Sequence, residues 1–427
     1  MHSIQPPLFD LEAFITLPEH SRLVMVLEAL SAEKLIATLE KERWTGRKGY
    51  PIRGMWSALM CGVLHGCKSR AEVVRLLKRD KGLRTICGFA GRDEVPSEDA
   101  LGRFLKKLVD HEGLLEECFV GLVEKLRQLL PGFGQKLVVD STDIKAYSSG
   151  HRKNRSDSDA RWGAKGAGHR SGPKSGTAQE GPAEGEERAR KERDLYYWFG
   201  YKLHLLVDAV YELPVSFVVT PANEADTTQM KVLLKKAGVD KPEKKPEAVI
   251  ADKGYDSKEN CRTVVQDYHA APIIPIIEKP GMQMPDICNA KGTPTCCCGL
   301  EMAYWGRDGN YLKYRCPQAV GKAKCLSRFP CTASPYGYVL KLSITEDPRR
   351  HCPVPRETRK WARLYRLRTS VERVNSRVKE LLGLGKITVR GISKVTVRSV
   401  LSLLVMLAAA VSMAERHRLK EVRALVT

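Results

Sequence analysis

The residues whose types and spacing best suit chemistry lie in residues 361–382, a stretch without Pro or Gly that is predicted to form one helix. At 3.6 residues per turn, four of its polar side chains fall within roughly 60° of one another, namely Tyr365, Arg368, Glu372 and Lys379. Two interpretations fit this spacing. It could be a solvated face with ion pairs between successive turns, or a metal-binding Glu on a surface that holds phosphates.

Two further acids end short apolar runs, a pattern that predicts buried strands. Asp140 lies in the run 136–141, and Asp252 ends the run 248–252. Carboxylates at neighbouring strand ends repel one another unless cations neutralise them. Their oxygen atoms suit Mg²⁺ or Mn²⁺, and two such ions about 3.5–4 Å apart support phosphodiester displacement. A single strand-end Asp is usually a turn or cap residue, so the chemical interpretation depends on Asp140, Asp252 and Glu372 together.

Three other acids are weaker candidates for the same site. Asp143 lies three positions after Asp140, and on a regular strand its side chain would point to the opposite face. Asp208 and Asp256 are interpreted as turn residues.

The Cys residues indicate a second candidate site. Six of the 13 Cys fall between positions 296 and 331, inside a stretch rich in Gly, Pro and Cys. A tetrahedral Zn²⁺ site needs four ligands. The predicted ligands are Cys298, Cys316, Cys325 and Cys331, with Cys296 as a substitute for Cys298. The alternative is a small β-rich flap with free thiols.

The elements that must position these residues indicate an α/β protein. Residues 1–130 are predicted to form a helical, DNA-binding domain, and residues 131–427 an α/β catalytic domain. Two segments interrupt the second domain: a disordered, basic, Gly/Ser-rich linker at 148–193 and a Cys-rich β insertion at 280–355.

Local patterns predict several individual elements. Residues 21–41 and 70–79 have helical periodicity, and Ser97 is placed to cap another helix. Residues 199–208 and 213–220 form a predicted hairpin. Asp226 is expected to cap the helix that follows, with Gln229 completing a capping box.

The charge balance points to a polyanion as partner. The chain has 71 Lys and Arg against 50 Asp and Glu, a net charge of +21, which favours nucleic acid over a membrane surface. The longest apolar stretch, residues 400–414, is shorter than the roughly 20 residues that span a bilayer, so a buried terminal helix is expected. No signal peptide is predicted, and the thiols are expected to be reduced in a cytoplasmic setting.

Together these motifs resemble a known family. Asp140 lies in Val-Val-Asp-Ser-Thr, and Asp252 in Ala-Asp-Lys-Gly-Tyr-Asp. With the spacing of Tyr365, Arg368, Glu372 and Lys379, they resemble bacterial insertion-sequence transposases of the DDE type. The resemblance is to the group named for its Tyr-Arg-Glu-Lys signature. Residues 51–108 resemble the helical N-terminal domain of these enzymes.

The resemblance implies an RNase H-like mixed sheet flanked by helices. It implies that Asp140, Asp252 and Glu372 hold two Mg²⁺ or Mn²⁺ ions that support strand nicking at transposon ends and strand transfer into target DNA. The residues implied to contact DNA are Tyr365, Arg368 and Lys379, with Trp305 as a candidate to hold a flipped base.

The resemblance also allows a zinc-ribbon-like insertion, and it implies a homodimer on double-stranded DNA in a bacterial cytoplasm, associated with the nucleoid. Two alternatives remain open. One is a nuclease of the same fold that cleaves without joining, and the other is a non-catalytic DNA-binding regulator.

Overall fold

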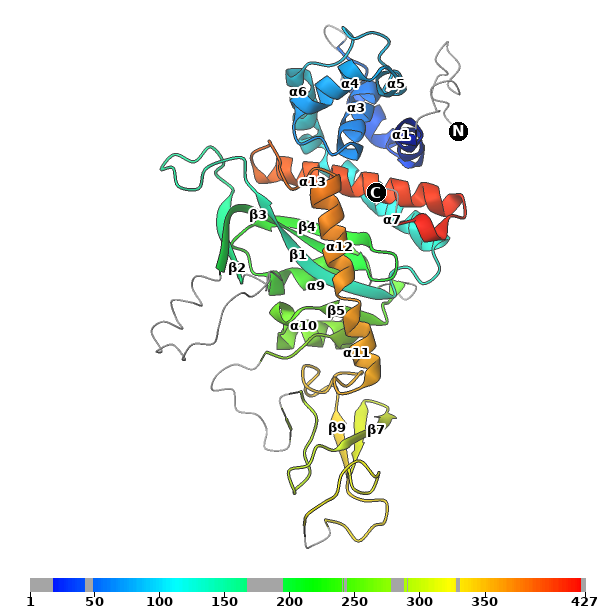
Figure 1. Ribbon diagram of the computed structural model, residues 1–427, viewed down its shortest axis with the longest axis vertical. Coiled ribbons are helices and arrows are strands. Elements are labelled where there is room, and N and C mark those ends of the chain that lie inside the picture. The colour runs from blue at the N-terminus through cyan, green and yellow to red at the C-terminus, as the bar shows by residue number, and fades with distance from the viewer. Residues whose placement is uncertain are drawn as a thin grey trace, which may run out of the picture.

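The structure is a computed structural model. It describes residues 18–42, 49–166, 195–239, 241, 244–277, 288–289, 291–327 and 331–423. The molecule is elongated (Figure 1). Helices occupy one end, a mixed α/β body the middle, and a small sheet the other end.

The N-terminal part consists of helices. They are α1 (Pro18–Ala29), α2 (Glu33–Lys41), α3 (Ile52–Leu64), α4 (Arg70–Arg79), α5 (Lys81–Ile86), α6 (Glu98–Asp110) and α7 (Glu112–Leu129). The predicted helix at 70–79 is confirmed as α4, and Ser97 caps α6 by accepting a hydrogen bond from Ala100 N. The single helix predicted at 21–41 is wrong, because it divides into α1 and α2. No Gly or Pro marks this break. Leu30 and Ala32 are both buried there, which indicates that tertiary packing decides it.

A six-stranded mixed sheet forms the central body, with strand order β2-β3-β1-β5-β6 and β4 paired to β3. Its strands are β1 (Lys136–Lys145), β2 (Arg161–Gly166), β3 (Leu195–Asp208), β4 (Leu213–Pro221), β5 (Ala248–Ala251) and β6 (Ala271–Ile273). The predicted hairpin is confirmed as β3 and β4, which pair antiparallel. β1 pairs antiparallel with β3 and parallel with β5.

Strand β2 corrects one prediction. It lies within the segment 148–193 that composition predicts to be disordered, yet it pairs along its length with β3. Just before it, the buried carboxylate of Asp157 accepts hydrogen bonds from Tyr201 Oη at 2.6 Å and Gly391 N at 3.2 Å. These partners are distant in sequence, so local composition could not reveal them. The rest of the predicted linker, from 167 to 193, lies outside the described residues.

Helices α9 (Asp226–Lys236) and α10 (Lys258–Arg262) follow strands of the sheet. Later come α11 (Arg359–Arg366), α12 (Thr369–Ser376) and a π-helical turn (Arg377–Leu381). The single helix predicted at 361–382 is therefore divided. At the break, Leu367 N and Arg368 N donate to carbonyls three residues earlier rather than four. This tight turn and the wide π turn alter the angular positions assumed for a regular helix.

Helix α13 (Ile392–Glu415) is apolar and long enough to cross a membrane by length and composition, but 94% of its most apolar window is buried inside the protein. It packs against α1, α3, α6, α7 and β4. The predicted buried terminal helix is thus confirmed. Phe119 of α7 also packs edge-on against Phe217 of β4, with ring centroids 5.0 Å apart. The predicted boundary at residue 130 therefore does not separate two hydrophobic cores, since one continuous core spans it.

The far end of the molecule is a small antiparallel sheet, which lies beyond α11 (Figure 1) and comes between β6 and α11 in the chain. Its strands are β7 (Ala303–Asp308), β8 (Tyr311–Arg315) and β9 (Val339–Ser343). We call residues 288–355 the insertion. It has a separate hydrophobic cluster that includes Leu312, Tyr314 and Leu342.

Candidate active site

The parallel pairing of β1 and β5 brings two of the predicted acids together. Val139 lies opposite Ala251 in the register, so Asp140 and Asp252 are the next residues on adjacent, parallel chain segments. Asp252 Oδ1 accepts a hydrogen bond from Gly254 N at 2.8 Å. This bond fixes the tight turn by which the chain leaves the sheet.

The electrostatics of Asp140 reflect this crowding. Burial raises the pKa of Asp140 to about 6, and the nearby carboxylate of Asp252 adds to the rise. Lys165 of β2 and Arg368 oppose it. Burial disfavours the charged carboxylate, and so does a like charge close by. Burial is the largest of these causes, and the cations nearby do not offset it for Asp140.

The third acid approaches from α12. Glu372 Oε1 lies 2.7 Å from an Arg368 guanidinium nitrogen. Burial lowers the pKa of Arg368, but the carboxylates of Glu372 and Asp140 raise it above its usual value. Burial also raises the pKa of Tyr365, with contributions from Asp252 and Glu372. The structure therefore gathers the three acids around Arg368 and Tyr365, despite the divided helix.

Lys379 occupies a different position from the one expected on a regular helix. Its ammonium donates to Asp143 Oδ1 at 2.9 Å, and Tyr196 Oη donates to the other oxygen of Asp143 at 3.3 Å. Burial raises the pKa of Asp143, but these contacts outweigh it and hold the pKa below its usual value. Lys379 is thus paired with the residue next to the site, three positions beyond Asp140 on β1.

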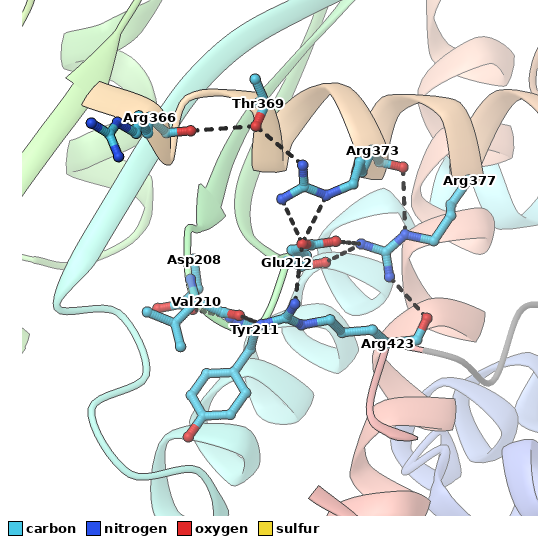
Figure 2. Close-up of polar contacts among 9 residues, drawn as sticks. All are labelled: Asp208, Val210, Tyr211, Glu212, Arg366, Thr369, Arg373, Arg377 and Arg423. Atoms are coloured by element: carbon cyan, nitrogen blue, oxygen red, sulfur yellow. Dashed lines mark hydrogen bonds and ion pairs between the residues drawn. The ribbon is translucent and has the colours of Figure 1, made fainter. Parts of the chain in front are cut away.

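A buried ion cluster holds α12 in place (Figure 2). Glu212, at the turn between β3 and β4, is 5% exposed and has a left-handed backbone with φ of 56°. Its carboxylate contacts Arg373 at 2.8 Å, Arg377 at 3.0 Å and Arg423 at 3.4 Å. Arg373 and Arg377 extend from the helical segment that carries Glu372. One turn of the sheet therefore fixes the position of this segment.

Several polar residues near the acids were not identified from the sequence. Lys165 lies in a segment whose composition predicts a disordered linker, so the sequence gives no reason to select it. The buried Tyr255 hydroxyl has a raised pKa because of burial and the nearby carboxylates of Asp140, Asp226 and Asp252. No local sequence signal separates these residues from ordinary core and turn positions.

The helix-capping prediction for Asp226 is wrong. Ala225 occupies the cap position of α9 and makes no side-chain cap hydrogen bond. Asp226 instead accepts from Lys202 at 2.9 Å and lies 3.8 Å from the buried His204. Burial lowers the pKa of His204 to about 4, so this imidazole is neutral at physiological pH.

The two remaining acids have structural contacts. Asp208 accepts from the backbone N–H groups of Gly134, Val210 and Tyr211, which confirms it as a turn residue. Asp256 instead forms a two-pronged ion pair with Arg349 at 2.6–2.8 Å.

The insertion residues differ from the predictions. Trp305 is 50% exposed on β7, and the Arg315 guanidinium lies over its ring at 4.3 Å. Among the described contacts, none joins Trp305 to the three acids. Of the four predicted zinc ligands, only Cys298 and Cys331 belong to the thiol cluster of the described residues, and Cys297 completes it. The prediction of Cys316 and Cys325 within this cluster is wrong.

The three acids suit a hard divalent cation. Asp140, Asp252 and Glu372 offer oxygen donors, as Mg²⁺ and Mn²⁺ prefer. The pKa of Asp140 is raised mainly by burial, and the nearby Asp252 carboxylate adds to it; a divalent ion would stabilise the charged form. The chemistry of the donor set therefore fits a metal site, but the three acids are not among the described groups whose ligand atoms all lie within 4.8 Å of one another.

Family comparisons agree with this geometry. A family model described as a transposase DDE domain matches residues 131–408, about two thirds of the chain. A second, described as a transposase domain (DUF772), matches residues 9–107. No curated protein matches the chain.

Proposed function

Since the chain belongs to the DDE transposase family, we propose that Asp140, Asp252 and Glu372 are the acids with which this DNA transposase nicks transposon ends and joins them to target DNA. The observation that supports the proposal is that Asp140 and Asp252 follow adjacent parallel strand segments of β1 and β5. Arg368 links Glu372 of α12 to this pair, because its guanidinium contacts Glu372 and interacts with the Asp140 carboxylate.

The three carboxylates would hold two Mg²⁺ or Mn²⁺ ions. Such ions, when bound, activate the attacking oxygen and stabilise the leaving one. The chain supplies acids held on rigid elements, which fixes the donors before DNA arrives. Burial of Asp140 keeps water from screening its charge, so the site favours a strongly charged cation.

We assign Arg368, Tyr365 and Lys379 to the DNA strand beside the acids. Arg368 has a fork of donors that suits a phosphate, and it is 27% exposed. A cation held by Glu372 would leave the Arg368 guanidinium free to bind a phosphate. Lys379 forms an ion pair with Asp143. This pair would hold the Lys379 ammonium next to the same DNA strand. Trp305 remains a candidate for stacking on a base.

The partners follow from charge and from the reaction. A net charge of +21 favours double-stranded DNA. Two transposon ends must be joined in one reaction, so we propose that a homodimer forms on paired ends. The proposed location is the bacterial cytoplasm, on the nucleoid.

The test is strand transfer with DNA that carries the element's own ends. Asp140→Asn, Asp252→Asn and Glu372→Gln should each lower joined product at least about a hundredfold while DNA binding persists. The matched controls are Glu380→Gln, an exposed acid on the same helical segment, and Asp267→Asn, an exposed acid after α10. Full activity in any of the three variants would remove that residue from the site.

The same assay separates the two alternatives. Cleavage without joined product would indicate a nuclease of the same fold. Metal-independent binding with neither cleavage nor joining would indicate a DNA-binding regulator. The gathered acids count against a regulator, because a surface that only binds DNA gains nothing from carboxylates where phosphates approach.

A further inference from the structure

The insertion has little hydrophobic material to hold it together. Its buried cluster consists of Cys288, Cys296, Met302, Leu312, Tyr314, Leu342 and Ile344. A core of this size rarely stabilises a small unit without a disulfide or a metal. All the Cys residues are free thiols, so a disulfide does not supply this support.

A tight hairpin presents two of the thiols. Thr295 and Glu301 pair across its base, and Cys296 N donates to Leu300 O at 2.9 Å. Gly299 closes the turn with a φ of 72°, a conformation that L-residues with side chains rarely adopt. Cys297 and Cys298 lie at the tip of this hairpin.

A third thiol reaches the tip from the connection between β8 and β9. Cys331 Sγ lies 2.9 Å from Cys297 Sγ, and Cys297 Sγ lies 3.8 Å from Cys298 Sγ. All three sulfur atoms are within 4.8 Å of one another. Cys297 and Cys331 are exposed, so burial in a hydrophobic core does not explain this meeting.

We propose that Cys297, Cys298 and Cys331 supply three of the four tetrahedral ligands of a zinc ion, with water in the fourth position, and that this ion fastens the 295–301 hairpin to the connection between β8 and β9. Two thiolates on one Zn²⁺ at about 2.3 Å lie about 3.8 Å apart in tetrahedral geometry. The 3.8 Å between the Cys297 and Cys298 sulfurs matches this distance. The Cys331 sulfur, 2.9 Å from that of Cys297, needs only a small movement to reach it. Each thiol releases its proton on binding.

This ligand set differs from the one that spacing predicts. Cys316 follows β8 directly and its N–H donates to Tyr338 O at 2.8 Å, while Cys325 N donates to the Gln318 side chain at 3.0 Å. These two residues therefore serve as controls, because they are Cys residues of the same connection outside the cluster.

The experiment measures zinc in the full-length protein, purified under reducing conditions without chelator. Elemental analysis should give about one zinc per chain. Cys297→Ser and Cys331→Ser should each lower the zinc content at least about tenfold, while Cys316→Ser and Cys325→Ser should keep it. Loss of zinc from either control to the same extent would overturn the assigned ligands.

Two further measurements use the wild-type protein, so their results do not depend on how the variants fold. Cobalt exchanged into the wild-type protein should show thiolate-to-cobalt charge-transfer absorption, and a mercurial reagent should release the zinc as thiols react. Wild-type protein with less than about a tenth of a zinc per chain would overturn the site. So would a disulfide between Cys297 and Cys331 in protein isolated from the cytoplasm.

Discussion

At the scale of single residues, Asp140 shows how a buried carboxylate lowers the stability of the protein that contains it. The pKa of Asp140 is raised to about 6, first by burial and then by Asp252. The folded state therefore binds a proton more tightly than the unfolded state, whose Asp has its usual pKa near 3.9. The metal-free protein should become more stable as pH falls from about 6 towards 4, and less stable above this range.

Asp140→Asn should consequently stabilise the metal-free protein at pH 7.5, by on the order of 1–3 kcal/mol. Thermal unfolding in the presence of EDTA measures the effect. Added Mg²⁺ should raise the melting temperature of the wild type but not of this variant. A variant that melts below the wild type under EDTA would contradict the electrostatic argument.

The same residue should control how Mg²⁺ binding depends on pH. Protonated Asp140 cannot bind the ion, so affinity should decrease as pH falls through about 6. Calorimetric titration between pH 5 and 8 should show roughly a tenfold loss for each pH unit below that value. The Glu380→Gln control should show the same profile. Constant affinity across this range would exclude Asp140 as a ligand.

At the scale of elements, the Glu212 cluster has the largest predicted effect. Glu212→Gln would leave Arg377, which is 10% exposed at its side chain, without its ionic partner. Removing one partner of a buried pair costs about 3–5 kcal/mol. Because Arg373 and Arg423 are about half exposed, solvent screens them, and about 2–3 kcal/mol is expected.

Urea unfolding measures this loss. Glu421→Gln provides the matched control, since Glu421 pairs with Arg418 at the surface and should contribute about 1 kcal/mol or less. Strand transfer should also decline in Glu212→Gln when the protein is fully folded, because α12 carries Glu372. Equal stability of the two variants would show that the cluster does not hold α12.

Local patterns predicted those elements whose causes are local. The apolar periodicity of α4, the cap at Ser97 and the alternation in β3 and β4 each depend on neighbouring residues. Strand β2 depends on pairing with a distant strand, and its composition gives no sign of it. The same reason explains why Lys165 was missed.

The site residues divide in the same way. Residue type and strand position led to the prediction of Asp140, Asp252 and Glu372; the structure places Asp140 and Asp252 on adjacent segments and pairs Glu372 with Arg368. The helical wheel assumes uniform geometry, whereas the chain has a tight turn at 367–368 and a π turn after Ser376, and Lys379 pairs with Asp143 of β1. Which of the six Cys residues between 296 and 331 lie close together depends on the fold of the 295–301 hairpin. The spacing of the Cys residues in the sequence does not show this.

At the scale of the whole molecule, net charge predicts how DNA binding responds to salt. Each phosphate that Lys or Arg neutralises releases condensed counterions. With a net charge of +21, DNA affinity should decrease at least about tenfold between 50 and 200 mM potassium chloride. Fluorescence anisotropy with a labelled duplex measures it. An affinity independent of salt would contradict a phosphate-based interface.

Helix α13 has a consequence for where the enzyme cuts. Helix α13 packs both on the N-terminal helices and on β4. The N-terminal helices therefore cannot rotate relative to Asp140, Asp252 and Glu372 without exposing apolar surface. If these helices bind DNA, as the sequence predicts, the distance along the DNA from their binding site to the bond that is cut is then set by the protein. If base pairs are inserted between the binding site and the normal cut, the cut should stay at the same distance from the binding site. It should therefore fall at a different nucleotide of the DNA sequence.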